Sequence, residues 1–140
     1  GEAAGIAILD DYAHHPTQIR ATLAAARAGY PGRRIWAVWQ PHTYTRTQTL
    51  LAEYAAAFGD ADRVLVTEVY AAREKNTGFS AAEVVARMNH PAARFTAGLE
   101  ETTALLLDEL RAGDVVLVLS AGDADQISRN VLDSLKEKEH

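Results

Sequence analysis

The sequence predicts an α/β domain whose mostly parallel sheet of five to six strands carries helices on both faces. Short apolar runs recur at 6–9, 35–39, 64–66 and 115–119, with a weaker candidate at 94–96, and the starts of these five segments are separated by 29, 29, 30 and 21 residues. This spacing is typical of one strand, one helix and two loops. The runs are rich in Val, Ile and Leu without alternation, as expected of parallel strands that are covered on both faces.

Length and composition are those of one ordinary globular domain. The chain has 140 residues, of which 48% are hydrophobic and 24% charged, and a chain of this size buries about 70% of its unfolded surface. No apolar run approaches the roughly 20 residues that cross a bilayer, and no signal-peptide pattern is present, so we expect a cytoplasmic protein without membrane contact. The net charge of −5, with scattered Lys and Arg, argues against nucleic-acid binding. The absence of cysteine excludes disulfides, thiol catalysis and thiolate metal sites.

The first elements follow from local signals. Residues 1–5 are small and polar, and we expect a linker there, cut from a longer protein. The first helix is expected to begin at Pro16, because proline has no N–H to leave unpaired, and to bury Ile19, Leu23 and Tyr30. The second helix is expected at about 47–58, and its apolar face would comprise Leu50, Leu51, Tyr54 and Phe58.

The later helices carry similar signals. Ser80 and Glu83 match a capping box, so a short helix should begin there. In this motif the side chain of each of the two residues accepts the backbone N–H of the other. The next helix is expected to bury Leu99, Thr103, Leu106, Leu107 and Leu110 before Gly113. The last helix should start near Asp123 and bury Ile127, Val131 and Leu135. The charged tail 136–140 is predicted to be frayed.

The two ends of the predicted sheet differ in composition. Connections from helix to strand are compact Gly, Pro and Asp turns. Connections from strand to helix, at 10–15, 40–46, 68–78 and 120–123, hold His, Arg, Tyr and carboxylate side chains. Ligands of open α/β sheets bind beyond the carboxyl ends of the strands, so these four loops form the predicted binding rim.

Two stretches of this rim are chemically dense. The stretch DDYAHHPT, at 10–17, places two carboxylates, a tyrosine and two histidines before a helix, whose terminal N–H groups favour anions. The stretch QPHTYTRT, at 40–47, places Arg46 near a helix N-terminus, where a cation opposes the helix dipole unless an anion lies between them. A ligand carboxylate or phosphate would resolve that conflict, since Arg binds such groups with two parallel hydrogen bonds.

Several familiar catalytic motifs are absent from the sequence. No Gly-x-x-x-x-Gly-Lys-Ser/Thr phosphate loop, Gly-x-Gly-x-x-Gly fingerprint or Gly-x-Ser-x-Gly nucleophile elbow occurs. The sequence therefore predicts only part of an active site.

These stretches carry a family resemblance. The motifs at 10–17, 40–47, 69–74 (VYAARE) and 120–123 (SAGD) make the sequence resemble the C-terminal domain of the Mur ligases along essentially the whole chain. The resemblance implies a Rossmann-like three-layer sandwich, the third domain of an ADP-forming ligase of peptidoglycan synthesis. A central ATPase domain and an N-terminal UDP-sugar domain of the same enzyme would be its partners, and the domain alone would be inactive. ATP and Mg would be bound mainly by the central domain, and no metal site is implied here.

The resemblance also implies roles for individual residues. Tyr12, His42 and Arg46 would bind L-alanine, Asp11, His14 and His15 would bind ATP, and Tyr70, Arg73, Ser120 and Gly122 would lie in supporting loops. Two positions depart from the family pattern: Thr43 replaces a frequent arginine, and Ser120 replaces a usual glycine. The QPHTYTRT stretch favours a member that ligates alanine over a murein-recycling relative that ligates a peptide.

Two alternatives belong to other classes of protein. A phosphoacceptor receiver domain would explain paired carboxylates after the first strand, but it needs an aspartate after the third strand and a lysine after the fifth, where this chain has Glu68 and Ser120. A small metallohydrolase could be built on Asp10, Asp11, His14 and His42.

Overall fold

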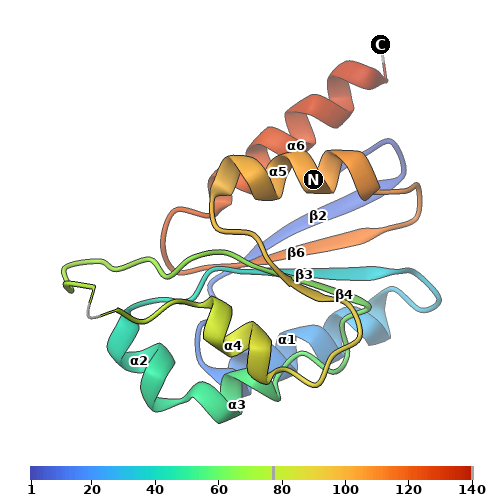
Figure 1. The fold of residues 1–140 in the computed structure, drawn as a ribbon. Helices are drawn as coiled ribbons and strands as arrows, with labels where there is room; N and C mark the ends of the chain where they lie inside the picture. Colours follow the sequence, from blue (N-terminus) through green and yellow to red (C-terminus); the bar gives the residue numbers. More distant parts are fainter. Residues whose placement is uncertain (77, 140) are drawn as a thin grey trace.

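A computed structural model describes residues 1–76 and 78–139 as a six-stranded sheet between two layers of helices (Figure 1). The strands are β1 (Glu2–Ala3), β2 (Ile6–Asp11), β3 (Ile35–Trp39), β4 (Arg63–Val66), β5 (Ala93–Phe95) and β6 (Val115–Leu119). The helices are α1 (Pro16–Gly29), α2 (Tyr44–Thr49), α3 (Leu51–Ala55), α4 (Ala82–Arg87), α5 (Leu99–Glu109) and α6 (Asp125–Lys138). The predicted α/β sandwich with a mostly parallel sheet is confirmed.

The strand order tests the receiver alternative. The order is β1-β2-β6-β3-β4-β5, with β1 antiparallel and all other pairs parallel. The first parallel strand therefore lies beside the last one. A receiver domain has its second strand next to the first, in the order 2-1-3-4-5. The receiver alternative is wrong.

Side chains of each central strand alternate between two apolar cores. In β3, Ala37 and Trp39 face the core under α1 to α4, whereas Trp36 and Val38 face the core under α5 and α6 (Figure 1). All five residues of β3 are buried, which explains why the run is continuously apolar. None of the helices in the described ranges combines the length and apolar character needed to cross a membrane.

Helix α1 follows the prediction closely. It begins at Pro16 and buries Ile19 and Leu23. Tyr30 lies just beyond the helix, where its N–H donates to the carbonyl oxygen of Ala26 at 2.9 Å, and it is only half-buried.

The prediction of one helix at about 47–58 is wrong. Two short helices, α2 and α3, meet at Leu50, whose φ of −108° and ψ of 26° interrupt the helical path. Helix α2 also begins earlier than expected, at Tyr44. Its threonines have low helix propensity, so contacts from outside the segment determine its start.

Both ends of the chain are more ordered than predicted. Residues 1–5 are not a linker, because Glu2–Ala3 pairs with β2 and the N–H of Ile8 donates to the carbonyl oxygen of Gly1 at 2.8 Å. Within the predicted frayed tail at 136–140, α6 continues to Lys138, and its last turn holds cations that favour the helix dipole. His140 lies outside the described residues.

The predicted helix starts at Ser80 and Asp123 are each shifted. Glu83 accepts the N–H of Ser80 at 3.2 Å, but the Ser80 hydroxyl accepts from Ala82 instead of Glu83, and α4 begins at Ala82. Helix α6 begins at Asp125 instead of Asp123. Of the residues predicted to be buried by α5, Leu106 is buried, whereas Leu99, Thr103, Leu107 and Leu110 are half-buried. Thr102, which was not predicted, is buried.

Asp114 ties together the amino ends of the strands. Its carboxylate accepts hydrogen bonds from Arg34 Nη2 at 2.7 Å, Arg34 Nε at 3.1 Å, Trp36 Nε1 at 3.0 Å and the Arg111 N–H at 3.0 Å. The Asp114 side chain is 5% exposed. This network joins the turn before β6 to β3, at the end of the sheet opposite the predicted rim.

Candidate functional site

Four loops meet beyond the carboxyl ends of the parallel strands, on the left of Figure 1. The loop after β2 is tied to the end of β6 by a hydrogen bond from the Ser120 N–H to the Asp11 carbonyl oxygen at 3.0 Å. The loops after β3 and β4 pair through a parallel bridge between His42 and Tyr70. The structure therefore brings the predicted rim loops together.

The stretch before α1 caps its own helix. The carboxylate of Asp11 accepts the N–H of Ala13 at 2.7 Å, and His15 Nδ1 accepts the N–H of Thr17 at 3.3 Å. The side-chain oxygen of Gln18 in turn accepts the N–H of His15 at 3.2 Å. This use of His15 as a helix cap was not evident from its position in the motif.

Tyr12 and His14 differ in exposure. The Tyr12 side chain is 82% exposed, an unusual position for a large aromatic group. His14 is half-buried, and its Nδ1 lies 2.8 Å from the carbonyl oxygen of Tyr12. Tyr54 of α3 donates its hydroxyl to the His14 carbonyl oxygen, so this loop is also fixed to the α2–α3 segment.

The two aspartates of DDYAHHPT are separated. Ser128 of α6 donates to the Asp10 carboxylate at 2.6 Å, whereas Asp11 caps the loop, because successive side chains of a strand point to opposite faces. Within residues 1–76 and 78–139, no three His, Cys, Asp or Glu side chains are grouped to hold a metal ion. The metallohydrolase alternative therefore lacks its ligand cluster.

The anion predicted beside Arg46 belongs to the protein itself. The carboxylate of Glu74 accepts the N–H groups of Tyr44 at 2.6 Å and Thr45 at 3.1 Å, which are the first two residues of α2. The Thr43 hydroxyl accepts the N–H of Arg46 at 3.4 Å. Glu74 therefore supplies an anion at this helix end, whereas the expected contact of Arg46 with a ligand carboxylate or phosphate stays a prediction. Arg46 is exposed and belongs to none of the ion pairs found in the described part of the chain.

Gln40 is a site residue that sequence reasoning missed. Its side chain is 5% exposed, and its Oε1 accepts from the Ser120 hydroxyl at 2.7 Å and from the N–H groups of Asp123 and Ala124 at 3.2 Å each. Its Nε2 donates to the Asp123 carboxylate at 2.7 Å. Gln40 thus joins the loop after β3 to the loop before α6. One of its hydrogen-bond donors is the hydroxyl of Ser120, a residue that departs from the pattern expected from the family resemblance. Only its place as the first residue after a strand hinted at this role.

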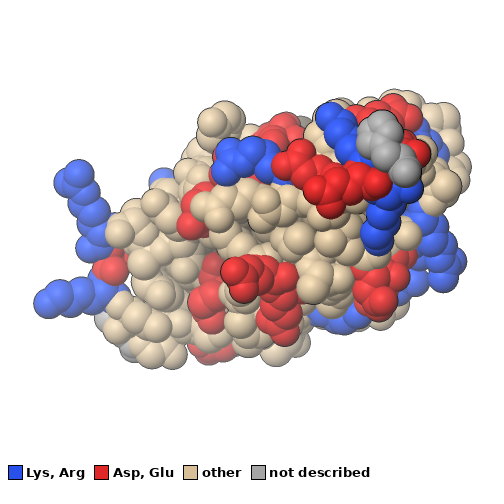
Figure 2. Space-filling view, turned by 90° about the horizontal axis from the view of Figure 1, so that it is seen from above, with Lys and Arg blue, Asp and Glu red and all other residues tan. Residues whose placement is uncertain are grey.

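Protein side chains cap the helices α1 and α2 where they face the rim, and Gln40 accepts N–H groups of the loop just before α6. Because the starts of α1 and α2 are occupied, we expect cationic side chains to recognise a ligand anion beside these two helices. Arg46 of α2 is exposed, and so are Arg73 and Lys75 of the loop after β4. Figure 2 shows basic side chains projecting from the same end of the molecule.

His42 lies beside these cations as a partly buried imidazole. Its ring stacks on Tyr70, with centroids 5.6 Å apart and planes at 19°. Its Nδ1 is buried and has no hydrogen-bond partner among the described residues. Burial lowers the pKa of His42, the positive charges of Arg46 and His14 lower it further, and Glu74 opposes them. His42 is therefore neutral at neutral pH.

Gly122 allows Tyr70 and Gln40 to approach the loop before α6. A Cβ at this position would lie 2.6 Å from Tyr70 Cγ and 2.7 Å from Gln40 Oε1. We expect Gly122→Ala to lower the free energy of unfolding by about 1 to 3 kcal/mol, because the ring and the bonded amide must both move. Urea denaturation measures the change. Gly59→Ala is the matched control, since a Cβ there meets nothing within 4 Å; equal effects of the two variants would contradict the prediction.

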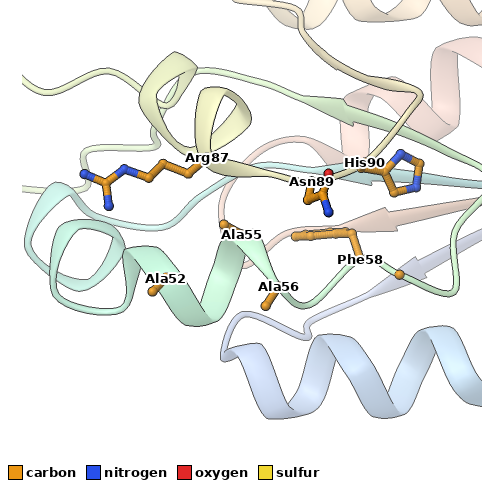
Figure 3. Close-up of a pocket in the computed structure, with 8 residues that line it drawn as sticks. Ala52, Ala55, Ala56, Phe58, Arg87, Asn89 and His90 are labelled. Atoms are coloured by element: carbon orange, nitrogen blue, oxygen red, sulfur yellow. The ribbon is translucent and has the colours of Figure 1, made fainter.

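A separate pocket between α3 and α4 contains none of the predicted site residues (Figure 3). It has a volume of about 280 Å³ and is lined by Ala52, Ala55, Ala56, Phe58, Gly59, Arg87, Asn89 and His90. His90 is already bonded, to the carbonyl oxygen of Ala61 at 2.7 Å and to the N–H of Ala92 at 3.0 Å. We assign no ligand to this pocket.

A family model described as "Mur ligase, glutamate ligase domain" matches residues 1–122. The chain belongs to the Mur ligase family. This Mur ligase domain is 47% identical to a UDP-N-acetylmuramate–L-alanine ligase of Alkaliphilus metalliredigens and 50% identical to one of Gloeobacter violaceus, over 94% of the chain in each case. The chain spans only 29% of the length of each of these relatives.

Solved structures show the same fold in other Mur ligases. A UDP-N-acetylmuramate–alanine ligase of Thermotoga maritima superposes with a TM-score of 0.77 at 27% identity, covering 96% of this chain and 28% of that one. A murein peptide ligase of Psychrobacter arcticus superposes with a TM-score of 0.81 at 26% identity, covering 97% of this chain and 28% of that one. The resemblance to the Mur ligases and the Rossmann-like fold are thus confirmed. The ligand roles of Tyr12, Asp11, His14, His15, His42 and Arg46 stay predictions.

Proposed function

We propose that this domain is the C-terminal part of an ADP-forming ligase that joins L-alanine to UDP-N-acetylmuramate. The exposed Arg46 beside a neutral His42 carries the proposal, because this pair offers one free cation and one uncharged imidazole to an amino acid. The identity to named alanine ligases supports the choice of substrate. The central ATPase and N-terminal UDP-sugar domains of the same enzyme are the proposed partners, and the cytoplasm, where nucleotide sugars and ATP occur, is the proposed location.

In the proposed reaction, the muramoyl carboxylate takes the γ-phosphoryl group of ATP and ADP leaves. The amine of L-alanine then attacks the carbonyl carbon of the acyl phosphate and loses a proton to solvent, and phosphate leaves as the amide bond forms. The contribution of this domain is positioning and charge stabilisation. Arg46 and His42, with Tyr12, bind the alanine, and Asp11, His14 and His15 face the ATP. Mg would neutralise phosphate charge, and we propose that it is held with ATP by the central domain.

ADP release by the full-length enzyme tests the proposal. We expect release to require ATP, UDP-N-acetylmuramate and L-alanine together, and the 140-residue domain alone to release none. An enzyme that ignores L-alanine would contradict the proposed substrate.

A peptide-ligating enzyme is the second candidate. The murein peptide ligase superposes with the higher TM-score of the two solved structures compared above. In the same assay, an enzyme of this kind would release ADP with the peptide L-alanyl-γ-D-glutamyl-diaminopimelate and not with L-alanine.

A further inference from the structure

Helix α2 cannot hold Arg46 in place by itself. It has six residues, and helices of this length are not stable in isolation. Threonines occupy three of its positions, 45, 47 and 49, and β-branched side chains lose rotamer freedom in a helix. The position of Arg46, the third residue of α2, therefore depends on the groups that hold the start of this helix.

The start of α2 is held by two capping side chains. Glu74 accepts the N–H groups of Tyr44 and Thr45, and the Thr43 hydroxyl accepts that of Arg46, so the first three N–H groups are all satisfied. Thr43 has a φ of 62° and a ψ of 146°, a conformation that is costly for a β-branched residue. Position 43 thus supplies one of the two capping side chains of α2.

Glu74 reaches α2 because the loops after β3 and β4 run side by side. Tyr70 donates its N–H to the Pro41 carbonyl oxygen at 2.8 Å and accepts the N–H of Thr43 at 2.9 Å. The N–H of Glu74 donates to the carbonyl oxygen of Ala71 at 3.0 Å, which closes a turn from Ala71 to Glu74, directly after Tyr70. This ladder fixes the carboxylate at the amino end of α2.

Glu74 holds the helix without neutralising Arg46. No ion pair joins the two side chains, so the guanidinium stays available to a ligand. The side chain of Thr45, the N–H of Thr45 and the N–H of Tyr44 all form hydrogen bonds to the Glu74 carboxylate. These bonds keep the pKa of Glu74 below its ordinary value. The carboxylate is therefore ionised at neutral pH, and an ionised carboxylate is a stronger acceptor than a neutral group.

We propose that Glu74 is a positioning residue for the amino-acid substrate: it fixes the start of α2 and thereby presents Arg46 at the rim beside His42. The inference rests on the proposed function, since it assigns Glu74 to the same alanine site. Glu74 acts through Arg46 and is not itself proposed to touch alanine. Because Glu74 already occupies the N–H groups of α2, the substrate carboxylate must bind to side chains.

Steady-state kinetics of the full-length enzyme test this role. We expect Glu74→Ala to raise the KM for L-alanine about tenfold, as the loss of a helix cap can, and to change the KM for ATP by less than about twofold. The kcat at saturating L-alanine should be retained. Glu74→Gln should recover most of the affinity, because its amide oxygen can accept the same two N–H groups.

Further variants separate positioning from folding. Glu74→Asp keeps the charge but is one methylene shorter, so it should raise the alanine KM as Glu74→Ala does. If Glu74→Ala does not fold, Glu74→Asp therefore decides the question. The double variant Glu74→Ala/Arg46→Ala should have an alanine KM within about twofold of Arg46→Ala alone, because residues that act as one unit are not additive. Glu53→Gln, an exposed change on α3, is the control and should match the wild type.

Three results would overturn the inference: an unchanged alanine KM in folded Glu74→Ala and Glu74→Asp, equal changes in the ATP and alanine KM, or additive effects with Arg46→Ala. A wild-type enzyme without alanine-dependent ADP release would instead refute the proposed function. An active wild type with neutral Glu74 variants refutes only the role of Glu74.

Discussion

Replacing Arg46 by alanine in the full-length enzyme is expected to raise the KM for L-alanine about tenfold to a hundredfold. A charge-assisted, two-pronged hydrogen bond to a carboxylate contributes on the order of 1.5 to 3 kcal/mol, and Arg46 is exposed and without an ion-pair partner in the described part of the chain. The KM for ATP should hardly change, since the ATP contacts are assigned to the loop before α1. Initial rates at varied L-alanine and varied ATP measure both constants.

Arg46→Lys should restore only part of the affinity, because an ammonium keeps the charge but lacks the planar fork. Folding should be unaffected by Arg46→Ala, because Arg46 is exposed and lies in both the first and the last turn of the six-residue helix α2, so that its effects on the helix dipole oppose each other. Arg20→Ala, an exposed change on α1, is the matched control and should leave both KM values unchanged. Unchanged alanine kinetics in a folded Arg46→Ala variant would refute the assignment. A parallel loss of ATP and alanine affinity would indicate a role in domain closure instead.

Asp114→Ala is expected to lower the free energy of unfolding of this domain by about 3 to 5 kcal/mol, the cost of breaking a buried ion pair by removing one partner. The carboxylate is 5% exposed and pairs with Arg34 at 2.7 Å. Its loss also leaves the Trp36 Nε1 and the Arg111 N–H without their acceptor. Urea denaturation at pH 7 measures the difference.

The effect of Asp114 should depend on pH. Burial alone would raise the pKa of Asp114, but hydrogen bonds from Arg34, the Arg111 N–H and Trp36 outweigh burial and lower it. A carboxyl group with a lowered pKa in the folded state stabilises the protein above its unfolded pKa, which is about 3.9, and loses this contribution as the pH falls through the folded value. The difference between wild type and Asp114→Ala should therefore be full at pH 7 and shrink below about pH 4.

Asp133→Ala provides the control for this prediction. Asp133 is exposed on α6 and has no hydrogen bond or ion pair among the described side chains, so its loss should change stability by less than about 0.5 kcal/mol. A difference between Asp114→Ala and wild type that stays below about 1 kcal/mol at pH 7, or that grows as the pH falls, would contradict the assignment.

Local sequence patterns were sufficient to predict the central strands and the start of the first helix. The strands at Ile35–Trp39 and Val115–Leu119 and the start of α1 at Pro16 agree with the predicted positions. A strand covered on both faces must be apolar along its whole length, and proline is tolerated in the first turn of a helix. Both features can be recognised in the sequence without knowing which segments pack against the strand or helix. The convergence of the rim loops followed from the same alternation of strands and helices.

The interior of the site required the tertiary structure. Glu74 lies 30 positions from Tyr44, and Gln40 lies 83 positions from Asp123, yet these pairs cap α2 and the loop before α6. A carboxylate or an amide has no distinctive local pattern when its partner is distant in sequence. For the same reason, the break at Leu50 and the early start of α2 were not predictable from periodicity.

The sequence by itself determined the fold class, the rim that carries the polar loops and the two motifs that connect the chain to the Mur ligases, because each is encoded in residues close together in the chain. Only the tertiary structure decided which polar groups remain free for a ligand. Asp11, His15, Gln40 and Glu74 are engaged with backbone N–H groups, whereas Arg46 is left without a partner in the described part of the chain. Whether a polar group is free depends on which segments fold against it, and those segments are brought together by the sheet.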